Sequence, residues 1–255
     1  MCNGGGHNYS NDSYQPVGLR NYAKIFLGWS GGSDALETDR KNALGNHLGS
    51  YDLSGSYKFK NWTLSNYWQF LWEDSSGLTP FNWRDGLMGI SVKSNIQESP
   101  INTINIEIIR TNDQGALKLD EDGNQFVEPD DFFNNSVYGS GWSYNNRVIG
   151  NPIFLINKDP ASERNIIDNM INGFSLGVAG QINNLKYQTS YRWFKNQGTY
   201  TDRLSEPYTL SSISSKIELK YSKSSFGFIL MYEWGKERPE GNTGLQLSYS
   251  RQFSF

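Results

Sequence analysis

Side chains that could bind a sugar gather in one loop-like stretch, residues 134–152. It holds aromatic, guanidinium and amide groups, namely Tyr138, Trp142, Tyr144, Arg147 and Asn151. The aromatic rings could stack on the apolar faces of sugar rings, and the guanidinium could donate two parallel hydrogen bonds to hydroxyls or to an acidic sugar. The stretch therefore predicts glycan contact. The alternative is that the loop folds inward as a small aromatic core and Arg147 pairs with a carboxylate.

A second group is charged and lies at the ends of two expected strands: Glu73, Asp74, Arg84 and Asp85. Acidic and basic side chains so close in sequence favour a structural charge network over a ligand site. Trp83 stands beside them. It fits an aromatic residue at a membrane interface as well as it fits a platform for a sugar.

An acidic stretch over residues 120–131 offers oxygen ligands of the kind that calcium prefers: Asp120, Glu121, Asp122, Glu128, Asp130 and Asp131. The position of Gly123 does not match the loop of an EF-hand. We therefore expect a solvated turn, and we expect no metal and no cofactor.

The histidines give little support for catalysis, because the chain has only His7 and His47. His7 lies in a segment without periodicity, and His47 stands near the end of an expected strand, where Asp34 or Asp52 could orient it. A lone histidine at a strand end is more often structural than catalytic. We expect no enzymatic activity and no catalytic residue.

Composition limits the class of protein. The 255 residues carry a net charge of only -3, which gives no argument for nucleic acid binding. Apolar residues make up 36% and aromatic residues 15%, a mixture typical of barrels with a polar interior and aromatic girdles. The single cysteine, Cys2, excludes an internal disulfide. No secretory signal is present, so we expect a truncated start, with residues 1–18 a disordered or cut tail.

The rest of the chain alternates apolar and polar residues with a period of two, which predicts strands with one apolar face. The last stretch, 242–255, is typical: Leu245, Leu247 and Tyr249 lie on one face, and the chain ends on an aromatic residue. About ten segments follow this rule. They are 19–29, 47–59, 62–72, 85–94, 104–109, 172–182, 185–193, 213–221, 226–234 and 242–255.

The connections between these segments alternate between short and long without exception, as in outer-membrane barrels with short periplasmic turns and long extracellular loops. We therefore predict an all-β, antiparallel transmembrane barrel over residues 19–255. Residues 112–171 form its long extracellular or plug loop, with one short helix at 166–171. A further loop contains Pro207. The polar strand faces would line the lumen with paired charges of both signs: Asp52, Lys58, Lys186, Arg192, Lys216, Glu218, Lys220 and Glu233.

Three stretches carry a more specific similarity: residues 45–52, residues 67–78 with 83–89, and residues 134–144 with 147–152. Together they resemble the capsule assembly Wzi family of outer-membrane barrels, in the form found in Bacteroidetes-like bacteria. The resemblance extends over about residues 20–255 and corresponds only to the C-terminal part of the family. It implies a full barrel of about 18 strands, with a helical plug before it.

The resemblance also implies a function. Members of this family are binding proteins rather than enzymes, with a lectin-like role in attaching capsular polysaccharide at the cell surface. We therefore expect capsular polysaccharide and outer-membrane lipid as partners, a location in the outer membrane, and a monomer. The alternative is a diffusion porin for saccharides. A steady open pore in planar bilayers would favour the porin.

Overall fold

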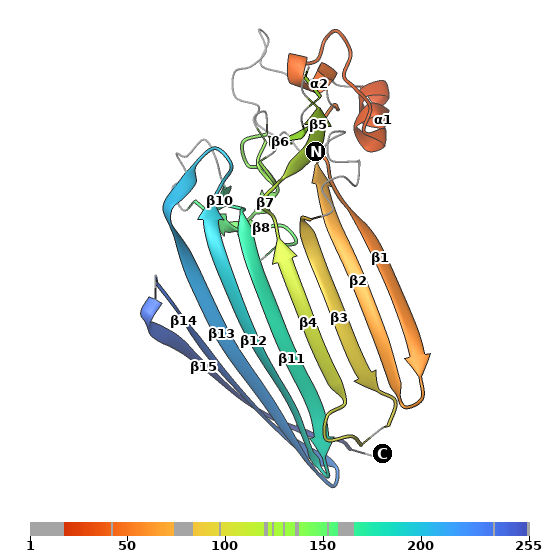
Figure 1. Cartoon of the computed structure of the whole chain (residues 1–255), viewed down its shortest axis with the longest axis vertical. Coiled ribbons are helices and arrows are strands. Elements are labelled where there is room, and N and C mark those ends of the chain that lie inside the picture. The colour runs from red at the N-terminus through yellow and green to blue at the C-terminus, as the bar shows by residue number, and fades with distance from the viewer. Residues whose placement is uncertain are drawn as a thin grey trace.

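The computed structural model describes most of the chain (Figure 1). The described residues are 18–41, 43–73, 84–96, 98–119, 122–123, 125–129, 131–135, 138–151, 153–157, 166–236 and 238–253. The expected tail, together with His7 and Cys2, lies outside them except for Gly18. Among these residues, no helix is long and apolar enough to cross a membrane.

One antiparallel sheet of nine strands dominates the fold. Its order is β1-β2-β3-β4-β11-β12-β13-β14-β15, so each strand pairs with its neighbours along the chain once the insert between β4 and β11 is set aside. The strands are β1 Leu48–Phe59, β2 Trp62–Glu73, β3 Gly86–Ser94, β4 Thr103–Arg110, β11 Ile171–Ile182, β12 Leu185–Gly198, β13 Arg203–Tyr221, β14 Ser224–Gly235 and β15 Arg238–Arg251. The predicted all-β antiparallel architecture is confirmed.

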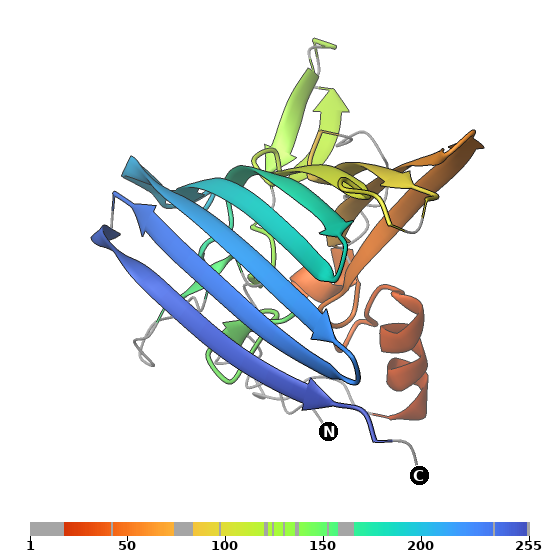
Figure 2. The same ribbon diagram turned by 90° about the horizontal axis from the view of Figure 1, so that it is seen from below.

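The sheet is curved and open (Figure 2). Within the described residues, β1 and β15 are its two edges, and each pairs on one side only. Closure into a barrel, which the sequence predicts, is therefore not seen in this sheet. Most of the strands have 12 residues or more, which is at least the length expected of a strand that crosses a membrane.

The two faces of the sheet differ in chemistry. The register places apolar side chains opposite one another on the convex face, for example Ile106, Leu176 and Tyr191. Many of them are exposed, including Leu53, Ile106, Leu176, Ile213, Leu230 and Leu247. Serine, asparagine, glycine and charged residues alternate with them on the concave face. This two-residue period confirms the alternation predicted from the sequence.

Aromatic rings concentrate on the convex face at two levels. Near the end that carries the insert, contacts between rings join Tyr51, Phe70, Trp68 and Trp72, and also Phe174, Tyr191, Trp193, Tyr232 and Trp234. At the opposite end of the sheet, where residues 60–61, 183–184 and 222–223 form the turns, Tyr57 contacts Phe59 and Phe226 contacts Tyr249. Such pairs of belts flank the apolar band of outer-membrane barrels.

The first predicted strand is wrong, because α1 is a helix over Leu19–Leu27. Leu19, Tyr22 and Phe26 follow a spacing of three and four, which places them on one helical face. The helix ends at Gly28, whose φ of 64° allows the backbone N–H groups of Gly28 and Trp29 to bond the last carbonyls. A second short helix, α2, covers Glu37–Lys41.

In its described residues, the long insert between β4 and β11 contains short strands: β5 Gly115–Leu119, β6 Gln125–Pro129, β7 Ser143–Tyr144, β8 Arg147–Val148, β9 Leu155–Ile156 and β10 Ile166–Asp168. The helix predicted at 166–171 is wrong. Its first part is β10, which pairs with β9, and β11 begins at Ile171. The stretch is too short to support a helix on its own.

The loop predicted around Pro207 is also largely strand, because β12 and β13 both extend beyond the expected ends. Their register shifts between Asn196 and Gly198, so Pro207 falls outside the matched pairs and donates no ladder hydrogen bond. The connection after β14 is likewise only residues 236–237. The alternation of long and short connections therefore fails in the C-terminal part.

Candidate functional site

The insert is fixed to the concave face of the sheet by a hydrophobic cluster. Its buried members are Phe132, Phe133, Val148, Phe154, Ile166 and Ile171. The rings of Phe133 and Phe154 meet edge to face, with centroids 5.0 Å apart. Leu71, Ile109 and Phe194 from the sheet pack against the cluster, and all three lie on the concave face by register. The loop therefore folds inward, which is the alternative considered from the sequence.

Two of the predicted charged residues anchor the insert through its backbone. The carboxylate of Asp85, which is 1% exposed, accepts hydrogen bonds from the N–H groups of Asn112, Asp113 and Gln114 at 2.8–3.1 Å. Burial raises the pKa of Asp85, and the three N–H donors partly oppose that shift. Arg110 Nε lies 3.8 Å from Asp85 Oδ1.

Glu73 holds a second point of the insert, because its Oε1 accepts a hydrogen bond of 2.7 Å from the N–H of Phe133. Arg84 is exposed, and Asp74 and Trp83 lie outside the described residues. Glu73 and Asp85 thus accept hydrogen bonds from backbone N–H groups of the insert, whereas the charge network expected among Glu73, Asp74, Arg84 and Asp85 stays a prediction.

Buried amides connect the two limbs of the insert, and the sequence did not single them out. The Gln114 side chain donates to the carbonyl oxygens of Thr111 and Asn169, and its own oxygen accepts from the N–H of Phe132. Asn169 in turn donates to Asp131 Oδ1 and to the Phe132 carbonyl. Gln114 and Asn169 are both fully buried, so each unmade bond here would be costly.

Among the described acids of the insert, Asp168 on β10 has a clearly raised pKa. Its side chain is buried, and Oδ1 accepts a hydrogen bond from the N–H of Gly198 at the end of β12. Burial raises the pKa of Asp168 to about 6, although hydrogen bonds with Tyr208, Asn196 and nearby backbone groups act in the opposite direction. The pKa of this carboxyl is therefore well above that of an ordinary aspartate.

The surface of the insert carries one small hairpin with exposed polar and aromatic groups. In β7 and β8, Tyr144 pairs with Arg147 across a turn of Asn145 and Asn146. Both asparagines have positive φ, 48° and 57°, as a two-residue hairpin turn of this type requires. Tyr144 is 72% exposed, and Arg147 is also exposed.

The base of this hairpin is buried. Val148 belongs to the hydrophobic cluster and Trp142 packs against it. The backbone N–H of Trp142 donates to Phe133 O at 2.7 Å, and Ile149 N–H donates to Trp142 O at 2.9 Å. Trp142 thus supports the hairpin from below, whereas Tyr144 and Arg147 stand on its exposed part.

The other predicted glycan ligands are more enclosed. Tyr138 is half-buried; burial and the nearby charge of Asp39 raise its pKa to about 12, against a hydrogen bond with the Gly45 backbone. Asn151 is buried, and its side-chain oxygen accepts the N–H of Ile153 in a tight turn. Of the five expected glycan ligands in this loop, Tyr144 and Arg147 therefore lie at the surface, whereas Tyr138, Trp142 and Asn151 are enclosed within the loop.

Two further sequence hypotheses concern His47 and the acidic stretch. His47 Nε2 lies 2.7 Å from the carbonyl oxygen of Ile25, so the imidazole joins α1 to the base of β1. Much of the stretch 120–131 lies outside the described residues. Among the residues that are described, no group of three or more His, Cys, Asp or Glu side chains could hold a metal.

A polar network on the concave face of the sheet was also not singled out from the sequence. The hydroxyl of Tyr67 on β2 donates to Glu107 Oε1 on β4, and Ser175 Oγ on β11 donates to Glu107 Oε2 at 2.7 Å. The ring of Tyr67 lies over Gly89, and a Cβ atom on Gly89 would be only 2.2 Å from the phenol ring. In the sequence, Gly89 was the one hint of this contact, because a glycine leaves room for the Tyr67 ring on the neighbouring strand.

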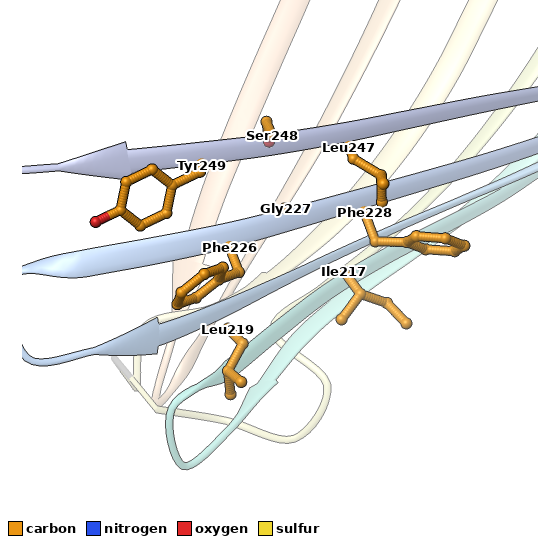
Figure 3. Close-up of a pocket in the computed structure, with 8 residues that line it drawn as sticks. All are labelled: Ile217, Leu219, Phe226, Gly227, Phe228, Leu247, Ser248 and Tyr249. Atoms are coloured by element: carbon orange, nitrogen blue, oxygen red, sulfur yellow. The ribbon is translucent and has the colours of Figure 1, made fainter.

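The convex face bears a shallow apolar hollow across β13, β14 and β15 (Figure 3). The side chains that line it include Ile217, Leu219, Phe226, Phe228, Leu247 and Tyr249, which stand on one side of the three strands. None of its lining residues is charged. The hollow therefore suits an apolar chain and offers little for recognition of a sugar.

Residues 13–159 match the family described as capsule assembly protein Wzi, which is more than half of the chain. The matched part includes α1, α2 and the strands from β1 to β9, and therefore the β7–β8 hairpin. No curated protein and no solved structure matches the chain.

Proposed function

The chain belongs to the Wzi family of outer-membrane capsule assembly proteins, and from this premise we propose that it binds capsular polysaccharide through the β7–β8 hairpin of its insert. The observation that supports this most directly is the pair Tyr144 and Arg147, side by side and exposed on a hairpin with a buried base. The role is lectin-like binding without catalysis.

The chemistry of the hairpin suits a sugar. The exposed phenol ring of Tyr144 can stack on the apolar face of a pyranose, and the guanidinium of Arg147 can donate two hydrogen bonds to adjacent hydroxyls or to a carboxylate. Asn145 and Asn146 add amide donors and acceptors at the turn. Because Trp142 and Val148 hold the base, binding would order few further side chains.

The position of the insert favours a tether over a porin. It packs on the concave face at one end of the sheet, where it occupies space that an open channel would need. A protein whose channel is filled by the insert in this way would hold a polymer at the end that carries the insert instead of conducting small solutes. Planar-bilayer recording separates the two functions, since the tether predicts no steady conductance and the porin predicts a stable open pore.

We further propose that the convex face contacts lipid in the outer membrane, with the insert at the extracellular side. The exposed apolar residues of that face and the two aromatic belts support this placement. The edges β1 and β15 carry unpaired backbone groups, which a membrane interior does not tolerate. In the membrane they would pair with each other or with further strands of a larger barrel, and the protein would act as a monomer.

The test is a double variant, Tyr144→Ala with Arg147→Ala, in cells that make a capsule. It should release capsular polysaccharide from the cell surface into the medium while the amount of the protein in the outer membrane stays unchanged. Trp142→Ala would be less informative, since this side chain also supports the hairpin.

The matched control is Tyr200→Ala with Arg203→Ala, which removes an exposed tyrosine from the connection between β12 and β13 and an exposed arginine from the first position of β13. This control should keep the capsule attached. Equal capsule retention in the hairpin variant and in the wild type would exclude the hairpin as the binding site.

A further inference from the structure

Helix α1 presents an apolar face that the rest of the described structure leaves largely open. The apolar side chains of the helix lie on one side, and Arg20, Asn21 and Lys24 lie on the other. None of its residues is buried, and Leu19 and Phe26 are 87% and 88% exposed. We call the following three side chains the α1 apolar face: Leu19, Tyr22 and Phe26.

Contacts near its C-terminal end hold α1 against the start of β1. His47 Nε2 lies 2.7 Å from the carbonyl oxygen of Ile25, and the N–H of Leu44 donates to the carbonyl oxygen of Trp29 at 3.0 Å. A Cβ atom on Gly45 would lie only 3.3 Å from the Ile25 side chain. The α1 apolar face is therefore exposed on a helix that is docked to the sheet through its Ile25 side.

The exposure of this face needs a physical explanation. A nine-residue helix is marginal in water on its own, because few backbone hydrogen bonds offset the cost of nucleation. Most helices in proteins gain their stability by packing an apolar face, and the α1 apolar face packs little. A helix with one apolar and one basic side is typical of helices that lie in the plane of a membrane surface. Lipid would supply the packing that α1 lacks.

The position of α1 fits such a surface. Figure 1 shows the helix at the insert end of the sheet, beside the start of β1, and Figure 2 shows it on the open side of the sheet. The ring contact between Tyr51 and Trp72, in the aromatic belt of this end, is only a few residues further along the strands. Tyr22 and Trp29 are exposed and belong to the residue types enriched at membrane–water interfaces. The helix therefore lies near the level that the belt marks.

The charges of α1 favour an anionic surface. Arg20 is exposed, Lys24 is half-buried, and residues 18–29 contain no Asp or Glu. In the loop that follows, Asp34 and Lys24 both approach Gly32, so Arg20 is the basic group more available to a partner. One basic side chain at an anionic membrane contributes about a fivefold preference for that membrane. Anionic, phosphate-bearing lipids match both the α1 apolar face and its basic flank.

We propose that α1 lies in the headgroup region of anionic, phosphate-bearing lipids at the insert side of the membrane, with its apolar face toward the acyl chains and Arg20 at the phosphates. This inference rests on the proposed placement of the convex face in lipid and is independent of sugar binding. The helix would hold the insert end of the edge strand β1 at the membrane surface.

The experiment places a nitroxide spin label on the full chain in vesicles of phosphatidylglycerol and phosphatidylcholine, through Phe26→Cys in a Cys2→Ser background. Oxygen, which concentrates in the bilayer, should relax this label more than a water-soluble nickel chelate does. A label at Arg40→Cys, on α2, should show the reverse. Stronger relaxation of the Phe26 label by nickel would overturn the proposal. So would a label that neither reagent reaches, because protein would then cover the face.

A label on the convex face separates this inference from the placement on which it rests. If Leu176→Cys is relaxed by oxygen and Phe26→Cys by nickel, only the inference about α1 is wrong; if nickel relaxes both, the placement of the convex face in lipid is wrong as well.

The charge assignment has its own variant, which leaves the apolar face intact. With the label at Phe26→Cys, Arg20→Gln should lower the ratio of lipid-inserted to water-exposed label about fivefold in vesicles that contain phosphatidylglycerol. It should have little effect in pure phosphatidylcholine. The control Arg40→Gln removes an exposed arginine from α2 and should leave the ratio unchanged. Equal effects of the two variants would contradict the role of Arg20 at the lipid phosphates.

Discussion

At the scale of single residues, a few buried or half-buried acids act as acceptors that hold the insert in place. Asp85 is the strongest case, since one buried carboxylate receives three consecutive backbone N–H groups. The sequence analysis grouped Glu73 and Asp85 at one end of two neighbouring expected strands. The sequence could not show that their partners are backbone groups 27 to 60 positions away, since such contacts leave no pattern in side-chain types.

Removal of the Asp85 carboxylate should loosen the start of the insert. In Asp85→Ala, three buried N–H groups lose a charged acceptor, and we expect a loss of about 3 kcal/mol in local stability. Hydrogen exchange of Asn112, Asp113 and Gln114 should accelerate strongly while the exchange of β12 amides stays slow. The control Glu206→Gln changes an exposed carboxylate. Unchanged exchange at Asn112–Gln114 in Asp85→Ala would contradict the anchoring role.

Asp168 gives a prediction about pH. Its pKa is raised to about 6, mainly by burial, whereas an unfolded aspartate has a pKa of about 3.9. Between about pH 4 and 6 the folded state keeps a proton that the unfolded state has lost, so stability falls as the pH rises through this window and changes little above it. The attachment of β10 should therefore be firmer in mild acid.

The variant Asp168→Asn keeps an acceptor for Gly198 and removes the titration. It should be more stable than the wild type above pH 6, by at most about 3 kcal/mol, and should lose this advantage below about pH 4. Protease cleavage of the insert, measured from pH 4 to pH 8, tests this. Asp202→Asn, at an exposed position, should retain the pH dependence of the wild type. A pH dependence that persists in Asp168→Asn would assign it to another group.

At the scale of elements, strands that alternate were predictable and short irregular elements were not. The β1–β4 and β11–β15 segments follow a two-residue period because one face is apolar and the other polar. Helix α1 was read as a strand because its three- and four-residue spacing spans only nine residues. The insert was read as unstructured because its core depends on Phe132, Phe133 and Phe154, which are not periodic and meet only in the folded protein.

The insert should depend on this small core as a unit. Phe133 is buried and packs edge to face on Phe154, so Phe133→Ala should cost about 3–5 kcal/mol through lost contacts and a cavity. The main sheet should persist, because its ladders do not involve Phe133. Limited proteolysis should cut the insert faster while circular dichroism keeps the β signal. Tyr200→Ala, at an exposed site, should cleave as the wild type does.

Loss of the insert also bears on function. If Phe133→Ala leaves the β7–β8 hairpin unsupported, capsule retention should fall together with protease resistance, even though Tyr144 and Arg147 are intact. Protease resistance equal to that of the wild type would show that the cluster contributes little to holding the insert.

At the scale of the whole molecule, the two faces of one sheet separate two environments. The convex face is apolar across all nine strands and exposed in the described structure, while the concave face carries the insert. The fold class and the direction of each face followed from the sequence, because the two-residue period determines both. Closure could not follow, since it depends on what pairs with the edges β1 and β15.

The last prediction compares two consecutive residues of β13 that face opposite sides. Ile213 is exposed on the convex face, opposite Tyr191 and Tyr232, and Ser214 lies on the concave face opposite Ser190 and Met231. A lysine at a lipid-facing position near the bilayer centre costs about 2–4 kcal/mol, whereas the same change on a lumen face is tolerated. Ile213→Lys should therefore reduce insertion into lipid vesicles and the outer membrane, and Ser214→Lys should insert as the wild type does. If the two variants insert equally well, the convex face does not contact lipid, and the exposed apolar side chains of that face would need another explanation.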